Sequence, residues 1–385
     1  MNKRVIIVLI IIFSFIIILG AAGFPSRGNN QEIPVLVTSF DPPTGFTRAE
    51  GPREWDFPED YGPHPDYQTE WWYYTGNLES ENGDHFGYQL TFFRRALIPS
   101  GDRVDRQSAW ATDQVYMAHF AITDVESVEH YDFERFARGA AGLAGSKINP
   151  FQVWLGDWRV EQVNDRKFAL RASQAEIELD LSLDDFKGPV LHGEGGYSQK
   201  GPDPGNASYY YSQTRLDTSG RLIIKNQVFA VKGMSWMDHE FSTNALSPGQ
   251  VGWDWFSLQL NEGSDLMVFQ IRRIDGSIDP FSSGTWVDSQ GQTSQLSNQQ
   301  FTLRAVDTWR SPNSGAEYPS EWLLEVPSLD LQLEIKPLLA DQEMDVSYIY
   351  WEGAVKIEGT ISGRQVSGIG YVELTGYAES MEGDF

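Results

Sequence analysis

Strict alternation of apolar and polar residues constrains the fold of this chain more than any other feature. Residues 175–183 and 329–336 carry an apolar side chain at every second position. This period of two is typical of a β-strand with one buried and one solvated face. Helix-type periodicity is weak, and its best stretch, residues 128–145, is interrupted by glycine. Polar turn signals recur between the apolar runs, at residues 81–84, 217–220, 261–264, 275–276 and 289–291. We therefore predict an all-β chain of antiparallel sandwich or barrel domains.

Two segments that are far apart in the sequence resemble each other. Residues 70–95 and 252–273 each hold a tryptophan-rich strand, a polar turn and an apolar strand that ends in Arg-Arg. Such an echo favours a duplicated unit, so we expect two related halves. We place the N-terminal domain at residues 60–240 and the C-terminal domain at residues 241–381.

The first 23 residues have the order of an export signal. Lys3 and Arg4 precede an apolar run at residues 5–19, and small residues follow it. The run is long for a cleaved signal and slightly short for a membrane span, so a removed signal peptide and a retained membrane anchor both stay open. Residues 24–59 are rich in proline and predict an extended linker. We expect the body of the protein to be exported, either periplasmic or extracellular.

The acidic surplus and several missing motifs exclude whole classes of function. The chain has 29 basic and 54 acidic residues, and its net charge of −25 repels the phosphates of nucleic acids. It has no cysteine, which excludes disulfides, thiolate metal sites and thiol catalysis. It also lacks a phosphate-binding loop, a nucleophile elbow and a His-Glu-x-x-His motif, and its six histidines are scattered. We therefore expect no cofactor and no metal.

The densest group of titratable residues lies between aromatic residues. Asp238, His239 and Glu240 stand between Trp236 and Phe241, and they are the candidate catalytic residues. Burial raises the pKa of a carboxyl group, so this group can keep an acid protonated near neutral pH, as an acid catalyst requires. In a regular strand Asp238 and Glu240 share one face and His239 points to the other, unless a bulge intervenes. A buried ion cluster at the domain junction explains the same residues equally well.

Aromatic residues supply most of the candidate binding positions. Alternate side chains of a barrel strand face one side, where aromatic rings can bind an apolar ligand or stabilise a carbocation through their π faces. Ordinary core packing explains aromatic residues as well. The candidate substrate-binding residues are Glu70, Trp71, Trp72, Tyr73, Tyr210, Trp236, Trp253 and Trp255.

These residues belong to longer segments that resemble a known family. Together the segments are similar to the carotenoid 1,2-hydratase (hydroxyneurosporene synthase) family in its broad sense. They are closer to its secreted AttH-like branch, which is often labelled as predicted secreted hydrolases, than to the carotenoid enzymes. The resemblance implies two lipocalin-like β-barrel domains side by side, with an apolar cavity. The matching segments are residues 60–65, 69–76, 90–95, 209–212, 233–241, 350–355 and 370–377.

The resemblance also implies a chemistry. In the hydratase branch, water adds to a C=C bond without a cofactor: a buried acid protonates the alkene, and water captures the carbocation. At the matching positions Asp238 is the acid, and His239 is the base or the group that orients water. The ligand would be an apolar isoprenoid or polyene. The residues along the path of the cation would be Trp72, Tyr73, Trp236 and Trp255.

Two other functions remain open at this point. The AttH-like branch is often linked to ABC-type exporters, which implies a non-catalytic carrier that hands over a lipid or another apolar ligand. The third possible class of function is a secreted ester hydrolase, but the sequence has no recognisable nucleophile for one.

Overall fold

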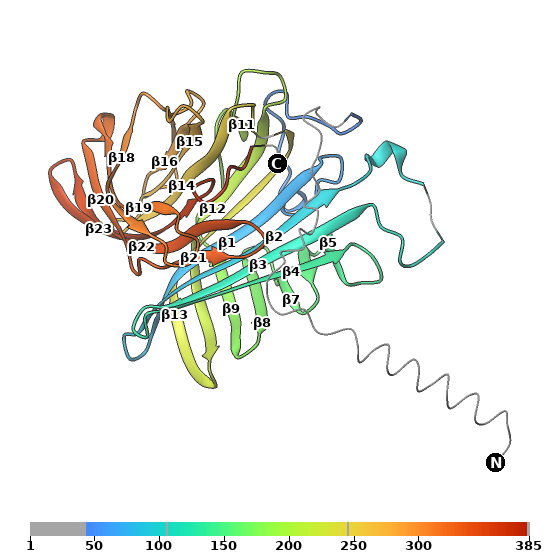
Figure 1. Ribbon diagram of the computed structural model, residues 1–385, viewed down its shortest axis with the longest axis horizontal. Coiled ribbons are helices and arrows are strands. Elements are labelled where there is room, and N and C mark those ends of the chain that lie inside the picture. Colours follow the sequence, from blue (N-terminus) through green and yellow to red (C-terminus); the bar gives the residue numbers. More distant parts are fainter. Residues whose placement is uncertain (1–43, 105–106, 245, 383–385) are drawn as a thin grey trace, which may run out of the picture. The chain divides into compact units, whose positions relative to one another are not determined.

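The segments with strict alternation are strands in the computed structural model (Figure 1). In β9 (Ile177–Asp185) and β20 (Leu331–Pro337), buried side chains alternate with exposed or half-buried ones along most of each strand. The structure describes residues 44–104, 107–244 and 246–382. The expected export segment 1–23 and residues 24–43 of the expected linker lie outside the described residues. Among those that are described, no helix has the length and apolar character needed to cross a membrane.

The first sheet contains thirteen strands within the described residues. Their order is β4-β3-β2-β1-β13-β12-β9-β8-β7-β6-β5, and β10 and β11 pair with β12. The strands β3 and β4 near one end contact β5 and β6 at the other, so this sheet nearly closes into a barrel. The strands are β1 (Thr69–Ser80), β2 (His85–Ala96), β3 (Gln114–Asp124), β4 (Glu129–Arg138), β5 (Ala144–Lys147), β6 (Gln152–Leu155), β7 (Trp158–Gln162), β8 (Lys167–Gln174), β9, β10 (Pro189–Leu191), β11 (Tyr197–Gln199), β12 (Ala207–Ile224) and β13 (Gln227–Asn244).

The second sheet contains ten strands within the same described ranges. Their order is β17-β16-β15-β14-β23-β22-β20-β19-β18, and β21 pairs with β22. Short 3-10 helices lie at Glu59–Tyr61, Ser100–Asp102 and Pro327–Leu329. The strands are β14 (Gln250–Leu260), β15 (Asp265–Arg273), β16 (Ser283–Val287), β17 (Thr293–Ser297), β18 (Thr302–Arg310), β19 (Glu317–Val326), β20, β21 (Glu343–Asp345), β22 (Ile349–Ile361) and β23 (Arg364–Leu374).

Each sheet has its own apolar core, and a third apolar cluster joins the two sheets. The expected all-β fold of two lipocalin-like antiparallel domains is confirmed. The chain passes from the first sheet to the second between β13 and β14. The domain boundary at residue 240 stays a prediction.

Close backbone approach lets the two sheets pack against each other. The strands β1 and β2 contact β23 and β22. The side-chain amide of Asn77 donates a hydrogen bond of 2.9 Å to the Gly370 carbonyl across this contact. At Gly87, an added Cβ would lie 2.7 Å from the Cβ of Ala354, so only glycine fits there. The outer faces of the two sheets thereby come together around the site described next.

The two tryptophan-rich hairpins occupy corresponding places in the two sheets. The strand β1 lies between β2 and β13, and β14 lies between β15 and β23. In this register Tyr73 stands opposite Asp238, and Trp255 stands opposite Glu373. Each sheet therefore brings one aromatic residue and one acidic residue to the region where the sheets meet.

Candidate active site

A cavity lined mainly by aromatic side chains lies where the two sheets meet. It contains about 850 Å³ of space free of atoms, part of it open to solvent. Three acidic side chains, Asp238, Glu240 and Glu373, and the ammonium group of Lys200 also line this inter-sheet cavity. An apolar wall with a few convergent polar groups is typical of a small-molecule site. The aromatic lining residues are Trp71, Tyr73, Phe93, Tyr210, Trp253, Trp255, Phe269 and Tyr348.

Asp238 is held in the cavity wall by three hydrogen bonds. The indole Nε1 of Trp236 donates to Oδ1 at 2.7 Å, and the Tyr210 hydroxyl donates to Oδ2 at 2.7 Å. The Ser212 hydroxyl also donates to Oδ1. Only 4% of Asp238 is exposed. Burial raises the pKa of this carboxyl to about 7, although the three hydrogen bonds act in the opposite direction. At neutral pH the carboxyl can therefore either hold a proton or release one.

The groups behind Asp238 are themselves fixed. Trp255 Nε1 donates a 2.9 Å hydrogen bond to the Tyr210 hydroxyl, which leaves the phenol proton for Asp238. His192 Nε2 lies 2.6 Å from the Ser212 hydroxyl. Burial lowers the pKa of His192 to about 3, so its ring is neutral. Ser212 is fully buried and does not line the cavity, so it orients Asp238 and lacks the access that a hydrolase nucleophile needs.

Glu373 is a second acid in the cavity, and it comes from the other sheet. Trp253 Nε1 donates a 2.7 Å hydrogen bond to its Oε2. Burial, together with the charges of Asp238 and Glu240, raises the pKa of Glu373 to about 7, although the hydrogen bond from Trp253 acts in the opposite direction. Two carboxyls that titrate near neutrality and repel each other favour a state in which one is protonated and the other is charged. That state is the pairing which acid–base catalysis requires.

Glu240 occupies the same face of β13 as Asp238 but has a cationic partner. Its Oε1 lies 3.3 Å from the Lys200 ammonium nitrogen. That nitrogen also lies 4.0 Å from the ring centre of Phe269, which is a cation–π contact. Glu240 and Lys200 therefore form an ion pair at the edge of the aromatic wall.

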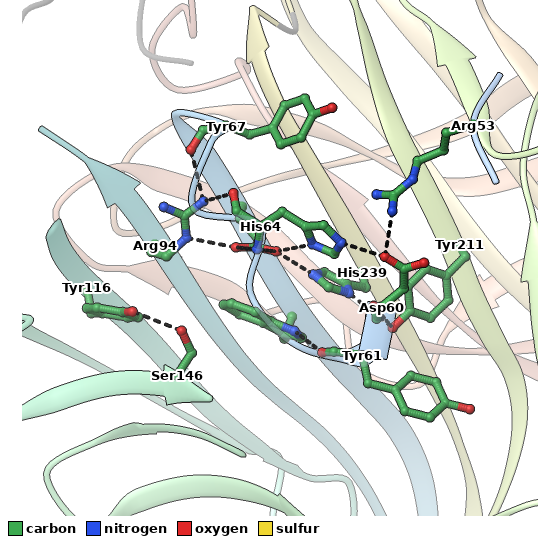
Figure 2. A network of polar contacts seen from close by, with 12 residues as sticks. Arg53, Asp60, Tyr61, His64, Tyr67, Arg94, Tyr116, Ser146, Tyr211 and His239 are labelled. Atoms are coloured by element: carbon green, nitrogen blue, oxygen red, sulfur yellow. Dashed lines mark hydrogen bonds and ion pairs between the residues drawn. The ribbon is translucent and has the colours of Figure 1, made fainter. Parts of the chain in front are cut away.

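His239 lies beside Tyr211 and His64 in the polar network of the first barrel (Figure 2), and it does not line the cavity. Its Nε2 lies 2.8 Å from Oε1 of Glu70, and its Nδ1 lies 3.0 Å from the Tyr211 hydroxyl. The pairing of β13 with β1 has no bulge between residues 231 and 242. Regular alternation therefore separates His239 from Asp238, which is one of the two arrangements that the sequence left open. Trp72 lies on the same side as His239 and stacks on it at 4.9 Å.

Glu70 is the centre of a buried polar group that we call the barrel ion network. Arg94 Nε donates to Oε2 of Glu70 at 2.7 Å, and His64 Nδ1 lies 2.8 Å from Oε1 (Figure 2). Burial raises the pKa of Glu70, but the charge of Arg94 and the bonds from both histidines hold it well below its usual range. Glu70 is therefore a carboxylate. The members of the network are Asp60, His64, Glu70, Arg94, Tyr211 and His239.

Part of this network could hold a metal ion. One donor atom each from His64, Glu70 and His239 lie within 4.8 Å of one another. The three residues lie 6 and 169 positions apart, so sequence spacing could not predict the group. Each donor atom already takes part in a hydrogen bond, and the Arg94 guanidinium adds positive charge beside Glu70. These contacts favour protons over a divalent cation at this point.

A family model described as AttH-like matches residues 48–377. The chain belongs to the AttH-like family. A solved structure of a putative AttH from Nitrosomonas europaea is 34% identical, has a TM-score of 0.77, and covers 86% of this chain and 100% of its own. The family predicted from the sequence is thereby confirmed, and carotenoid specificity stays a prediction.

Two curated relatives of this AttH-like protein have names that refer to water addition or removal. Kievitone hydratase from Fusarium solani subsp. phaseoli is 22% identical, over 64% of this chain and 71% of its own length. Dehydratase asqC from Emericella nidulans is 20% identical, over 66% of this chain and 75% of its own length.

The candidate residues of the AttH-like protein divide into three groups. Trp236 lies behind the cavity wall and holds Asp238. Glu70, Trp72 and His239 lie in the barrel interior. Glu373 was not among the residues predicted from the sequence, although its place opposite Trp255 matches that of Asp238 opposite Tyr73. The residues that line the cavity are Trp71, Tyr73, Tyr210, Asp238, Glu240, Trp253 and Trp255.

Proposed function

We propose that this AttH-like protein is a hydratase or dehydratase that works on an apolar, unsaturated small molecule in the inter-sheet cavity. The observation that carries the proposal is the Asp238 carboxyl, which lies in an aromatic wall and has a pKa of about 7. The printed names of the two curated relatives support a reaction that adds or removes water. An isoprenoid or polyene is the substrate class that we propose.

In this mechanism Asp238 and Glu373 have complementary roles. Protonated Asp238 transfers its proton to one alkene carbon, and the positive charge on the other carbon is stabilised by the π faces of Tyr73 and Trp255. A water molecule forms a C–O bond at that carbon and loses one proton to the Glu373 carboxylate. The alkene has then gained one water, Asp238 is charged and Glu373 is protonated. Removal of water runs through the same steps in reverse.

His239 has no place in this scheme. It was expected to be the base or the water-orienting group, but its two ring nitrogens are bonded to Glu70 and Tyr211 inside the barrel. Glu373 faces the cavity from the sheet opposite Asp238 and takes the proton from water instead.

Incubation of the purified full chain with lycopene and a panel of other polyenes and prenylated alkenes tests the proposal. Mass spectrometry would detect the gain of one water. We expect Asp238→Asn to lower turnover by about 10²-fold or more, the usual contribution of a positioned acid. The matched control is Asp124→Asn, which alters a buried carboxyl outside the cavity that accepts the Ser127 backbone N–H.

The outcomes separate enzyme from carrier. Full turnover by Asp238→Asn would refute the acid role. An alkene that binds tightly and is recovered unchanged from every incubation would refute the enzyme and favour a non-catalytic carrier, the alternative that the AttH-like branch implied. The predicted export of the body would give either kind of protein access to a ligand that resides in a membrane.

A further inference from the structure

Four buried polar atoms behind the cavity have no hydrogen-bond partner among the described residues. They are both carboxyl oxygens of Glu352 and the hydroxyl oxygens of Tyr73 and Tyr371. Glu352 is completely buried on β22, directly opposite Glu373 on β23. The residues Tyr73, Tyr371 and Ala354 belong to one cluster between the sheets, so these polar atoms are enclosed by the two sheets.

Glu352 is close to acidic and phenolic groups on both sheets. Burial raises its pKa well above the usual range, and the charge of Glu373 raises it further. The phenols of Tyr73 and Tyr350 lie close enough to Glu352 to lower its pKa in part, although neither makes a hydrogen bond of full geometry to it. The raised pKa favours the protonated form of Glu352, and its O–H group needs an acceptor. Buried polar groups without protein partners are the usual places for internal water.

A line of hydrogen bonds runs from this point toward the surface. Tyr350 is two residues before Glu352 on the same face of β22, and its hydroxyl lies 2.8 Å from His119 Nδ1 on the first sheet. His119 Nε2 lies 3.1 Å from Oε1 of Glu134, whose side chain is 16% exposed. Glu134 also accepts a hydrogen bond from the Ser347 hydroxyl.

The direction of these bonds is fixed by their ends. Burial raises the pKa of Glu134, but hydrogen bonds from His119 and Ser347 lower it overall, so Glu134 is a carboxylate that accepts. When its ring is neutral, His119 then donates from Nε2 and accepts at Nδ1, and the donor to Nδ1 is the Tyr350 hydroxyl. The phenol oxygen of Tyr350 is left free to accept a proton from the side of Glu352.

We propose that Glu352, together with an internal water bound between it and the hydroxyls of Tyr73 and Tyr371, passes protons between the cavity and the surface through Tyr350, His119 and Glu134. In one transfer Glu352 releases a proton to Tyr350, Tyr350 gives its own to His119 Nδ1, and His119 gives its Nε2 proton to Glu134. Glu352 ends as a carboxylate, Glu134 ends as an acid, and the His119 ring ends in its other tautomer, which must revert before the next transfer. Glu373 can then give a proton to Glu352.

This role rests on the proposed function, because hydration leaves Glu373 protonated and Asp238 charged after each turnover. An apolar ligand that fills the cavity keeps bulk water away from both acids. A separate route for protons lets Glu373 return to the carboxylate form while the cavity is occupied. Asp238 regains its proton from solvent when product leaves.

Infrared spectroscopy can follow the Glu352 proton without any substrate. The carbonyl band of a protonated carboxyl shifts when its proton is replaced by deuterium, and Glu352→Gln identifies the band that belongs to Glu352. After transfer of the full chain into D2O, we expect His119→Gln to slow this shift by about tenfold or more, since it breaks the line. The control is His130→Gln, which replaces a half-buried histidine on the first sheet whose Nδ1 bonds to Thr123.

Crystals of the full chain test the water directly. We expect ordered density within hydrogen-bond distance of Glu352 and of the Tyr73 or Tyr371 hydroxyl. An empty site, or a His119→Gln protein whose Glu352 band shifts at the wild-type rate, would overturn the proposal. Neither result depends on turnover. A wild-type protein that hydrates no alkene would therefore refute the proposed function, and these two measurements would still decide whether the proton route exists.

Activity supplies a further check if the hydratase function holds. We expect Glu352→Gln to lower kcat by about tenfold with KM unchanged, because Glu352 does not line the cavity. Glu343→Gln is the control, since Glu343 is a buried acid of the same sheet that is bonded to Ser311 and Ser314. An unchanged kcat in Glu352→Gln would also overturn the proton route.

Discussion

Replacing Asp238 by asparagine should remove a loss of stability that the folded protein undergoes as the pH rises toward neutrality. The pKa of this carboxyl rises from its ordinary 3.8 to about 7 on folding, mainly through burial. The folded state therefore binds the Asp238 proton more tightly than the unfolded state does. Stability from this group is fully present below pH 3.8 and is lost as the pH rises to about 7. Asparagine cannot ionise and so escapes this loss.

The size of the effect follows from the change in pKa. A rise of about three pKa units, at about 1.4 kcal/mol each, corresponds to about 4 kcal/mol. Because Asp238 is coupled to Glu373 and Glu240, we regard this as an upper value. The free energy of unfolding of the two proteins should therefore diverge by a few kcal/mol between pH 4 and pH 8, whatever constant offset the substitution adds.

Urea unfolding at a series of pH values measures this divergence. Asp124→Asn is again the control, because it retains the Asp238 carboxyl and should keep the loss of stability that this group causes. Parallel pH profiles for wild type and Asp238→Asn would refute the argument, because they would mean that Asp238 ionises at its ordinary pKa. The assay needs no substrate and so tests the acid independently of the reaction.

Three further predictions concern the fold. Gly87→Val should lower the free energy of unfolding, measured in urea, by about 1–3 kcal/mol, because the added Cβ meets Ala354. The control is Gly101→Ala, which should cost little because the space around Gly101 is open. Equal losses in the two variants would mean that the sheets can move apart. Glu70→Gln should cost about 3–5 kcal/mol by leaving Arg94 buried without its anion, and a near-neutral result would contradict a charged barrel ion network. Chelation or added zinc should leave the melting temperature unchanged, and a marked rise with zinc would turn the barrel ion network into a metal centre.

The sequence predicted the kind of element well where one face of a strand is buried. Alternation at residues 175–183 follows the burial of β9, and the same rule predicted that Asp238 and Glu240 would face away from His239. Residues 128–145, the best helical pattern, instead contain β4, whose side chains are half-buried or exposed along the strand. An edge strand without a distinctly buried face leaves little period-two signal to read.

The sequence alone could not predict which residues of the two sheets come into contact. Glu373 meets Asp238 only because the two sheets pack through β1 and β23, and no spacing rule encodes that packing. The same holds for the line from Glu352 to His119, which crosses from one sheet to the other. The echo of the two hairpins held a usable signal, since it places Glu373 and Asp238 at corresponding positions.

The interior of the first barrel is filled by an apolar core and by a buried ion network, with Trp72, His239 and Arg94 fully enclosed. Small barrels of the lipocalin type can hold one ligand inside. Here the interior is filled by side chains, and the cavity that we propose as the ligand site lies between the outer walls of the two sheets. If the proposed site is correct, the residues that select the ligand are different from those that form each apolar core. Related proteins could then change their ligand through substitutions in the cavity wall alone, without substitutions in the apolar cores of the two sheets.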